Sequence, residues 1–364
     1  MAADLGTSIA GDVANQVTNA VLKYFTRGPT LKQTMQERPL LRFLQAGKKT
    51  FPGGNQYISD PVQGAFMSDS AAGLVGSMTN AAAFFAGYAE DDQLQFAQAA
   101  NILRAEYKWY ECHAGFVITW TELKKDGISI TDGGKKSEHA DMALTRLTGL
   151  LENRLEDFAE SWARSVNNML WKDGSQDANQ VPGVLALITA APAVGTTGGL
   201  DRATYTWWRN LAYLNVPASE ADQTLTKTLR SKQRTLRRYG GKPNKFLCGS
   251  TWLDKLELEI QAKGQVTTSG FNSKEATDIG MADVSMRGVG NFEYDPTLDD
   301  LGMDNYCYEF DSRRIRLRPM EGEENKIINP ERPYQYMVFL KSMTWTGALQ
   351  ATQLNCHAIW SCTK

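Results

Sequence analysis

The 364-residue chain carries 39 Lys and Arg against 41 Asp and Glu, and 42% of its residues are hydrophobic. This composition excludes intrinsic disorder as a description of the whole chain. The formal net charge of −2 argues against a DNA-reading protein held mainly by phosphate contacts. Because the length exceeds the usual single domain of roughly 100–150 residues, we expect two or more lobes.

The N-terminal stretch predicts an amphipathic arm. Apolar residues recur there at steps of four, the spacing of one stripe on a helix: Leu5, Ile9, Val13, Val17 and Val21. A second short helix is expected over 31–45, with Pro39 inside it. Since neither helix has enough apolar residues for its own core, residues 1–45 are expected to lie on another surface.

The stretch from 51 to about 130 predicts a long hairpin. Residues 56–62 and 104–122 have the composition of strands. Between them, residues 64–90 are rich in Gly, Ala and Ser and carry four aromatic rings: Phe66, Phe84, Phe85 and Tyr88. A connection of this length with little regular structure is usually functional.

A single long helix is expected over 137–171. Leu144, Leu147, Leu151, Leu155, Phe158, Trp162, Val166 and Met169 follow steps of three and four. Ser137 is the expected N-cap, and Gly174 follows the expected end. Because the stripe is not a strict heptad, we expect a spine across a sheet rather than a coiled coil.

The chain after Gly174 predicts a mixture of helices and strands. Strands are expected at 184–189 and 246–248, a hairpin from 306–310 and 315–318 around Asp311, and two closing strands at 334–346 and 348–359. Helices are expected at 219–239 and 250–262, and a short one capped by Asp201.

The sequence carries no catalytic, cofactor or metal template. Asp132 and Glu293 stand where a phosphate loop and a dinucleotide fingerprint require Gly. His113, His139 and His357 are not spaced to share a metal, and neither CxxC nor a Gly-x-Ser-x-Gly elbow occurs. We therefore expect no enzyme, no cofactor and no metal.

Three more expectations concern export, membranes and thiols. The first nine residues carry Asp4 and no basic stretch, so they do not form a secretory signal. The longest apolar run, 181–195, is interrupted by proline and glycine and is too short for a membrane span, so no membrane partner is expected. The five scattered cysteines predict free thiols and no structural disulfide.

One basic run stands out because no acidic residue interrupts it. It consists of Lys227, Arg230, Lys232, Arg234, Arg237, Arg238, Lys242 and Lys245. Three interpretations stay open: a nucleic-acid patch, a solvated helix face, or an interface with an acidic surface of another subunit. The candidate acidic complements are Asp295, Asp299, Asp300 and Asp304, and separately Glu321, Glu323 and Glu324.

The order of these elements resembles the major capsid proteins of tailed bacteriophages, of the HK-ninety-seven type. Two local segments are similar to recurrent ones in that family. The first is 198–202 followed by Tyr205 and 207–210. The second is 286–318, with Gly288, the 294–296 turn and the strands at 305–310 and 315–318.

The resemblance implies an α+β fold with an N-terminal arm, an extended β-hairpin loop, a long spine helix with a peripheral sheet, and a mixed α/β axial domain. The implied boundaries are 1–45 for the arm, 46–126 for the extended loop with its flanking strands, 127–175 for the spine helix, 176–325 for the axial domain and 326–364 for the terminal peripheral strands.

The implied function is a structural subunit that assembles into pentamers and hexamers of an icosahedral phage head around double-stranded DNA. The virion is its location, after assembly in the host cytoplasm. The implied partners are other copies of the chain, a portal, packaged DNA in non-specific contact and, since the arm begins near Met1, a separate scaffolding protein unless the product is already mature. The expected subunit-interface residues are Phe66, Phe84, Phe85, Tyr88, Arg230, Arg234, Arg237 and Arg238.

Two alternatives remain. One is the shell of a cellular nanocompartment with the same fold, which would enclose enzymes instead of DNA. The other, less favoured, is an uncharacterised enzyme. Particle size separates the enzyme from both shells, and electron micrographs with tails and a portal separate a phage head from a nanocompartment.

Overall fold

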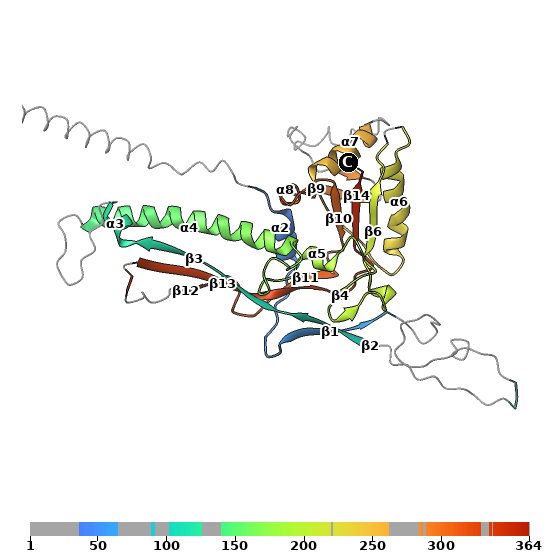
Figure 1. Ribbon diagram of the computed structural model, residues 1–364, viewed down its shortest axis with the longest axis horizontal. Helices are drawn as coiled ribbons and strands as arrows, with labels where there is room; N and C mark the ends of the chain where they lie inside the picture. Colours follow the sequence, from blue (N-terminus) through green and yellow to red (C-terminus); the bar gives the residue numbers. More distant parts are fainter. Residues whose placement is uncertain are drawn as a thin grey trace, which may run out of the picture.

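The computed structural model describes residues 36–64, 89–91, 102–125, 140–219, 221–261, 284–286, 289–328, 335–336 and 338–363. The helix expected over 4–25 and the expected N-cap Ser137 lie outside these residues. The described chain forms two lobes, an elongated one built on a long helix and long strands, and a second one around a six-stranded sheet that also holds the C-terminus (Figure 1).

The elongated lobe is organised by the 14-residue strand β13 (Val338–Ala351). β3 (Tyr110–Thr119) pairs antiparallel with it along one edge, and β12 (Lys326–Ile328) and β11 (Ile315–Pro319) pair with it along the other. We call this four-stranded sheet the peripheral sheet. The prediction of two separate closing strands at 334–346 and 348–359 is wrong, because β13 continues through Gly347. A Cβ there would meet the Arg318 carbonyl oxygen at 2.6 Å, so glycine instead permits close strand contact.

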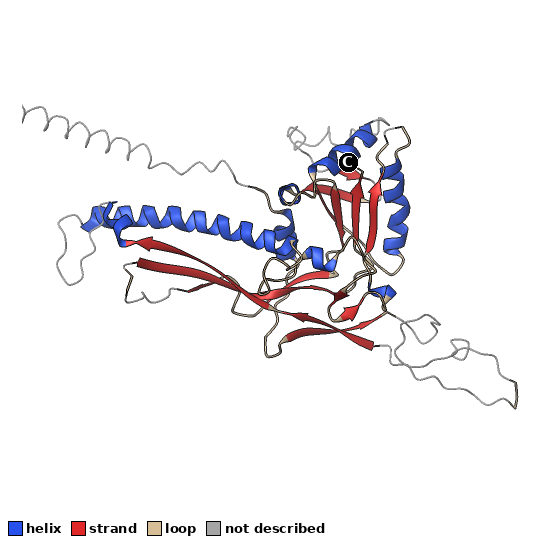
Figure 2. Ribbon diagram, viewed as in Figure 1, coloured by secondary structure: helices blue, strands red, loops and turns tan. Residues whose placement is uncertain are grey.

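The expected spine is α4 (Ala140–Trp171), which covers one face of the peripheral sheet (Figure 2). Phe158 packs on Phe116 of β3 with ring centroids 5.2 Å apart, and Met169 and Trp171 at its C-terminal end are buried. Leu155 departs from the expected stripe and is 37% exposed. The side chains of Leu144, Leu147 and Leu151 lie outside the described part.

The expected long hairpin is present at its base. β1 (Tyr57–Gln63) and β2 (Ile102–Lys108) pair antiparallel over their full lengths, from Tyr57 opposite Lys108 to Gln63 opposite Ile102. Ile58, Val62, Ala105 and Tyr107 are buried on one face of this ribbon. The Tyr107 hydroxyl donates to the Ala351 carbonyl at 2.8 Å, which ties the ribbon to β13.

The second lobe contains a mixed six-stranded sheet in the order β6-β14-β10-β7-β9-β8. We call it the axial sheet. Its strands are β6 (Leu211–Val216), β7 (Lys245–Cys248), β8 (Val284–Met286), β9 (Gly290–Tyr294), β10 (Tyr306–Phe310) and β14 (Ala358–Cys362). The helices α6 (Thr224–Arg237), α7 (Ser250–Gln261) and α8 (Pro296–Asp300) accompany it. Its core gathers large apolar side chains from strands and helices, among them Leu229, Phe246, Trp252, Phe292 and Trp360.

A second core joins the two lobes. Leu40 and Leu44 of α2 (Pro39–Ala46) pack in it with Trp171 of the spine, Tyr308 of β10 and Leu349 of β13. The rings of Trp171 and Tyr308 meet at 5.1 Å. Of the helix expected over 31–45, residues 31–35 lie outside the described part; within that part the helix begins at Pro39, in the first turn, where its missing N–H is no loss.

The expected strand at 184–189 is wrong. Residues Val184–Leu187 form the short helix α5. Periodicity cannot separate a short buried strand from a short buried helix. At this position the hydrogen bonds of the fully buried Arg202 favour the helix. Its guanidinium donates to the carbonyls of Ala186 and Leu187 and to Asn210, which satisfies the end of this helix turn.

The helix predicted after Asp201 is shorter than expected. Asp201 closes the turn by accepting from the N–H groups of Ala203 and Thr204. The helical residues that follow are only the 3-10 turn η2 (Thr206–Trp208). Short pieces complete the chain: β4 (Thr196–Thr197), β5 (Leu200–Asp201) and α3 (Trp120–Lys125), the last replacing the end of the strand region expected over 104–122.

The expected hairpin of 306–310 and 315–318 is also wrong. Both strands exist, but β10 pairs with β7 and β14 in the axial sheet, whereas β11 pairs with β13 in the peripheral sheet. The Asp311 turn therefore passes the chain from one lobe to the other. Among the described residues, no helix is long and apolar enough to cross a membrane.

Candidate subunit interfaces

The two expected groups of interface residues differ in what the structure describes. Phe66, Phe84, Phe85 and Tyr88 lie outside the described residues. Arg230, Arg234 and Arg237 lie on α6, and Arg238 is its C-cap. All four arginines are exposed.

Helix α6 separates its basic and apolar residues cleanly. Leu225, Leu229 and Leu236 are buried in the axial core, and the basic side chains point away from it. Arg234 and Arg237 occupy the last turn, where a positive charge favours the helix dipole. In the described part of the chain, no ion pair involves Arg230 or Arg234.

Two buried carboxylates fix α6 on the lobe. Glu259 of α7 is 1% exposed and accepts from the N–H groups of Leu225 and Thr226, which replaces the missing side-chain cap at Gln223. Glu309 of β10 is fully buried and accepts from the Gln233 amide and from Trp360 Nε1 at 2.9 Å. The basic face is thus held on a rigid support rather than on a loop.

The basic run does not form one surface. Lys245 is partly buried and pairs with Glu293, which also receives Arg42. Lys232 Nζ lies 5.5 Å from the ring centroid of Tyr213. The exposed basic surface is therefore the α6 face with Lys242 beyond it, a shorter surface than the sequence suggested.

Most of the candidate acidic complements serve internal roles. Asp295 is fully buried and caps α8 by accepting from the Thr297 N–H, while Trp171 Nε1 donates to it at 3.0 Å. This excludes Asp295 as a surface complement. Asp299 accepts from Ser250 and Tyr294, and Asp304 accepts from Thr251.

The other four acidic candidates are exposed or make only weak internal contacts or lysine pairs. Asp300 is exposed and accepts from Gln36. Glu323 pairs with Lys326, and Glu324 pairs with Lys48 at 2.8 Å. Glu321 is exposed. The acidic surface on the described residues is therefore smaller than the sequence suggested.

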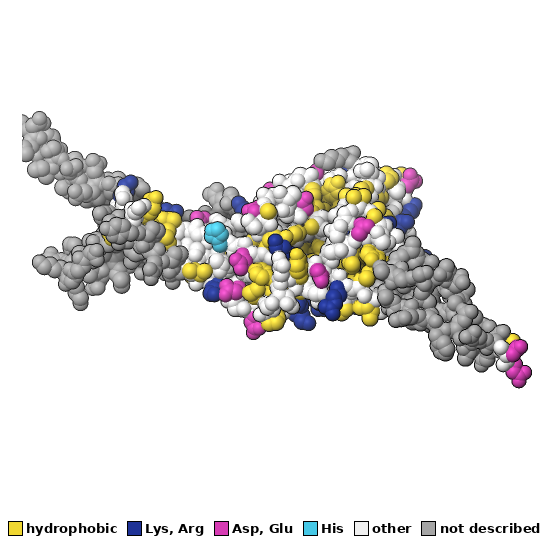
Figure 3. All heavy atoms as spheres, turned by 60° about the horizontal axis from the view of Figure 1, so that its bottom comes forward, with side chains coloured by type: hydrophobic (Ala, Val, Ile, Leu, Met, Phe, Trp, Pro, Cys, Tyr) yellow, Lys and Arg dark blue, Asp and Glu magenta, His cyan; other side chains and the backbone are white. Residues whose placement is uncertain are grey.

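The face of the peripheral sheet opposite α4 is partly apolar. Val117 of β3 is 52% exposed, and Ile328 of β12 is 39% exposed. The pairing of Val117 with Leu340 and of Ile328 with Ser342 puts these side chains on one face of the sheet. When the bottom of Figure 1 is turned forward, hydrophobic, basic and acidic side chains lie interspersed (Figure 3). The exposed apolar side chains make this face a candidate interface.

A second basic feature was missed in the sequence. Arg314, at the edge of β11, and Arg316 and Arg318 within it alternate with the buried Ile315 and Leu317. We call the three half-buried side chains the arginine row. The Nε atoms of Arg314 and Arg318 are buried without a hydrogen-bond partner. The strict alternation of Arg with apolar residues from 314 to 318 was the signal that would have revealed this row.

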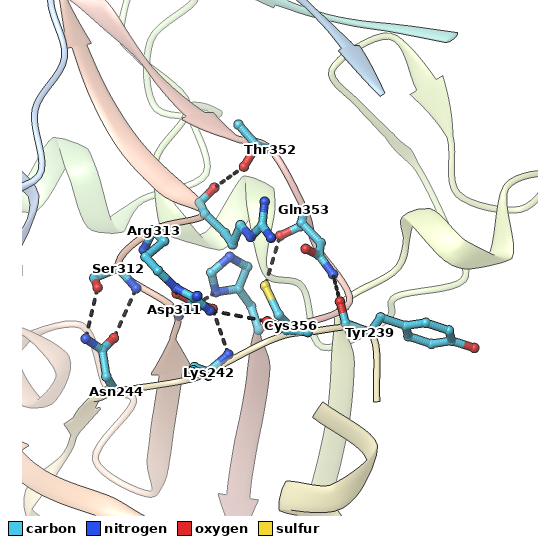
Figure 4. Close-up of polar contacts among 12 residues, drawn as sticks. Tyr239, Lys242, Asn244, Asp311, Ser312, Arg313, Thr352, Gln353 and Cys356 are labelled. Carbon is cyan, nitrogen blue, oxygen red and sulfur yellow. Dashed lines mark hydrogen bonds and ion pairs between the residues drawn. The ribbon is translucent and has the colours of Figure 1, made fainter. Parts of the chain in front are cut away.

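The two lobes meet in a polar junction around Asp311 (Figure 4). Its buried carboxylate accepts from the Lys242 N–H at 2.8 Å and from the Arg313 guanidinium at 2.7 Å. Burial alone would raise the pKa of Asp311, but these bonds hold it below its ordinary value. The Asp311 N–H donates to His357 Nδ1 at 3.2 Å, which ties the passage from β10 to β11 to the passage from β13 to β14.

The described residues hold neither a metal cluster nor an activated thiol. No group of three or more His, Cys, Asp or Glu residues among them is placed to bind a metal. A groove of about 670 Å³ between β3 and α4 is lined by Cys112, His113, Trp162 and Met169, among others. Burial raises the pKa of Cys112, which makes its thiol a poorer nucleophile.

The chain matches known proteins in structure but not in sequence. No protein-family model matches the chain, and no curated protein sequence matches it. Among solved structures, the chain is similar to that of the cyanophage A-1(L) capsid asymmetric unit, with a TM-score of 0.60 and 13% identity over 92% of this chain and 96% of the other.

Two further capsid structures give the same result. The match to the capsid of Myoviridae phage XM1 has a TM-score of 0.54 and 12% identity, over 92% of this chain and 96% of the other. The match to the capsid of cyanophage P-SCSP1u has a TM-score of 0.53 and 9% identity, over 93% and 91%. The chain thus has an α+β fold of the HK-ninety-seven type, as the sequence resemblance implied.

Proposed function

We propose that this protein is the structural subunit of an icosahedral phage head, assembling into pentamers and hexamers around double-stranded DNA. The observation that carries the proposal is the correspondence of fold with phage capsid structures over more than nine tenths of this chain and of theirs. The proposed role is structural and not catalytic.

The exposed surfaces support this role. The subunit presents a basic helix face, a partly apolar sheet face and an arginine row. A chain with such surfaces on both of its lobes suits repeated contacts with identical copies, which close into rings and shells. In this proposal α6 and the rings at Phe66, Phe84, Phe85 and Tyr88 contribute to contacts between subunits.

The proposed division of the chain keeps the expected boundaries of 1–45 for the arm, 46–126 for the extended loop, 127–175 and 326–364 for the peripheral domain and 176–325 for the axial domain, with two exchanges. The strand β11 belongs with the peripheral sheet, and β14 belongs with the axial sheet. The continuous core around Trp171 and Tyr308 and the Asp311 junction support two lobes that act as one rigid unit. In such a unit, a contact that moves one lobe also moves the other.

Further partners belong to the proposal through the role of a phage head. These are a separate scaffolding protein, a portal and packaged DNA in non-specific contact, with the virion as the final location and the host cytoplasm as the place of assembly. The basic face of α6 supports contact with DNA or with another subunit, and a charge-reversal test given below separates the two.

The deciding experiment is size-exclusion chromatography and electron microscopy of the expressed chain. Closed shells of uniform diameter, or capsomers that form shells when a scaffold is co-expressed, are expected. A small oligomer under every condition would refute the shell proposal. Cryo-electron microscopy of particles from their native source should show DNA and a portal vertex, whereas a nanocompartment would contain cargo protein instead.

A further inference from the structure

Two buried thiols of the axial core lie in contact with each other. The Sγ atoms of Cys248 on β7 and Cys307 on β10 are 3.1 Å apart, and both residues are 0% exposed. Both are free thiols in the structure. Their separation is only about 1 Å longer than the S–S bond of a disulfide, which measures about 2.05 Å. The proposed function gives this contact no role.

The strand register holds the two cysteines in a geometry that suits a disulfide. Cys248 and Cys307 lie directly opposite each other in the antiparallel pair of β7 with β10, and the Gly249 N–H beside them donates to the Tyr306 carbonyl at 2.9 Å. This bonding pattern makes them a non-hydrogen-bonded pair, whose Cα atoms lie about 4.5 Å apart. Since a disulfide accepts Cα separations of about 4.4–6.8 Å, rotation of the two side chains can bring the sulfurs to bonding distance.

The structure directs the other three thiols toward different groups. Cys362, in the same core, has its Sγ 3.6 Å from the Asn305 carbonyl oxygen. Cys356 Sγ lies 3.3 Å from the Gln353 carbonyl oxygen, and Cys112 Sγ lies 3.4 Å from Met169 Sδ. The register therefore favours one intrachain pairing, that of the two opposed cysteines.

We propose that Cys248 and Cys307 form an intrachain disulfide when the protein meets a small-molecule disulfide as oxidant. The thiolate of one cysteine attacks a sulfur of the small disulfide and releases its other half. The second cysteine then attacks the sulfur of the first, which forms the bond between the two residues and releases the remaining half. Two cysteine thiols are thus oxidised, one external disulfide is reduced to two thiols, and the two cysteine protons pass to the released thiolates.

Burial controls the rate of this reaction. Neither thiol is accessible from solvent, and burial raises the pKa of the Cys307 thiol well above its ordinary value. Because thiolate is the attacking species, the exchange requires local opening of the axial lobe. The bond should therefore form slowly in the native protein and faster in urea at concentrations below the unfolding transition.

The bond would lock the centre of the axial lobe. It would join β7 to β10 across 59 positions of sequence, a loop that carries α7, β9 and α8. A cross-link of this kind stabilises a fold mainly by restricting the unfolded chain. One consequence rests on the proposed function: a phage head would assemble with reduced thiols in the host cytoplasm and acquire the lock after release, because cytosolic thiols are kept reduced.

Oxidation of the purified full chain tests the pairing. The reduced protein is incubated with glutathione disulfide at neutral pH, with and without urea below the unfolding transition, and the remaining thiols are alkylated in denaturant. Two of the five thiols should disappear without added glutathione mass. Peptide mapping by mass spectrometry should join the peptides that contain Cys248 and Cys307, and dithiothreitol should restore both thiols.

Matched variants make the result specific. Cys248→Ala and Cys307→Ala should each abolish the intrachain bond, whereas Cys362→Ala, which removes a third thiol of the same core, should leave it intact. Oxidised wild type should gain at least about 4 °C in Tm over the reduced protein, and the first two variants should gain nothing. Peptide mapping of the wild type needs no variant, so the pairing is testable even if a variant fails to fold.

The outcomes separate the disulfide from the proposed function. Wild-type protein that keeps both thiols even in urea, or that joins Cys362 or Cys356 instead, refutes the proposed pairing. A bond that forms without raising Tm refutes the lock. None of these measurements requires shells: a chain that forms the bond but never assembles refutes the proposed function alone, and shells whose thiols never pair refute the disulfide alone.

Discussion

One buried residue, Glu309 in the axial lobe, makes the stability of the fold depend on pH. It is fully buried beneath α6, and burial raises its pKa to about 7 despite the bonds from Gln233 and Trp360. The folded protein therefore holds a proton between about pH 4.5 and 7 that the unfolded chain releases. By linkage, this group lowers the stability of the fold as the pH rises through that window.

The Glu309→Gln variant should remove this dependence. Once the Gln233 amide turns over, the new amide can donate to Gln233 Oε1, a buried atom without a partner in the present arrangement, and can still accept from Trp360. The variant should exceed wild type in stability by up to about 3 kcal/mol above pH 7, with the difference vanishing near pH 4.5. Denaturant unfolding across this pH range measures it, with the exposed Glu321→Gln as control.

His357 makes the stability of the fold depend on pH in the opposite direction. It is fully buried, and burial lowers its pKa to about 4. Its contribution to stability is therefore complete above about pH 6.5 and is lost as the pH falls toward 4. The Glu309→Gln variant should accordingly lose stability on acidification more steeply than wild type. An equal pH profile for the two proteins would contradict both assignments.

The thiols provide a second prediction at this scale. Cys248, Cys307, Cys356 and Cys362 are buried, Cys112 is half-buried, and all five are free. Burial raises the pKa of Cys356 to about 12, which suppresses the reactive thiolate. Assembled particles should therefore run as monomers on denaturing gels with and without reductant. A ladder that disappears on reduction would show covalent links between subunits.

At the scale of elements, the basic face of α6 allows a direct test of its role. Reversing Arg230 and Arg234 to Glu should block capsomer formation if the face meets another subunit. One rim ion pair contributes only about 0–1 kcal/mol, but the contact repeats in every subunit. Native gel electrophoresis measures capsomers, and circular dichroism controls for folding. Normal capsomers with poor DNA retention would favour contact with nucleic acid instead.

The spine helix is tested by truncation of Phe158. The sequence predicted full burial, for which Phe→Ala costs about 3–5 kcal/mol. In the structure the ring is half-buried against Phe116, so we expect about 2 kcal/mol, less than that range. Denaturant unfolding measures the loss, and Leu155→Ala on the exposed side of the same helix is the matched control. Equal losses for the two variants would mean that the helix faces are wrongly assigned.

At the scale of the whole molecule, the extended loop should matter for assembly and not for folding. The β1–β2 base pairs over its full length and is tied to β13 through Tyr107, and both contacts lie outside 66–88. Replacing 66–88 with a short Gly-Ser bridge should therefore leave a folded protomer by circular dichroism but abolish closed particles in electron micrographs. Each removed ring would otherwise contribute about 1.5–3 kcal/mol on burial.

Two other results of this deletion would each contradict one part of the prediction. Normal shells would show that residues 66–88 make no essential contact between subunits. An unfolded protomer would show that the segment belongs to the core of its own subunit. The control is a Gly-Ser insertion at the exposed Gly302 turn, which lies outside the extended loop.

The sequence by itself determined the elements whose pattern is local. The steps of three and four over 140–171 specify the spine, the apolar stripe of α6 specifies its buried face, and the paired strand compositions specify the β1–β2 ribbon. These patterns suffice because each depends on neighbours within a few residues along the chain. The order of such elements was also enough to identify the resemblance to phage capsid proteins.

Only the tertiary structure decided which elements meet. The strands β10 and β11 are adjacent in sequence but belong to different sheets, because Asp311 turns the chain at the junction. The apolar run at Val184–Leu187 is a helix because Arg202, fifteen residues after Leu187, satisfies its carbonyls. Asp295 looked like surface charge and is a buried cap. Lys242, Arg202 and Trp171 supply hydrogen bonds to Asp311, Leu187 and Asp295 from distant positions in the sequence, and local pattern carries no information about such partners.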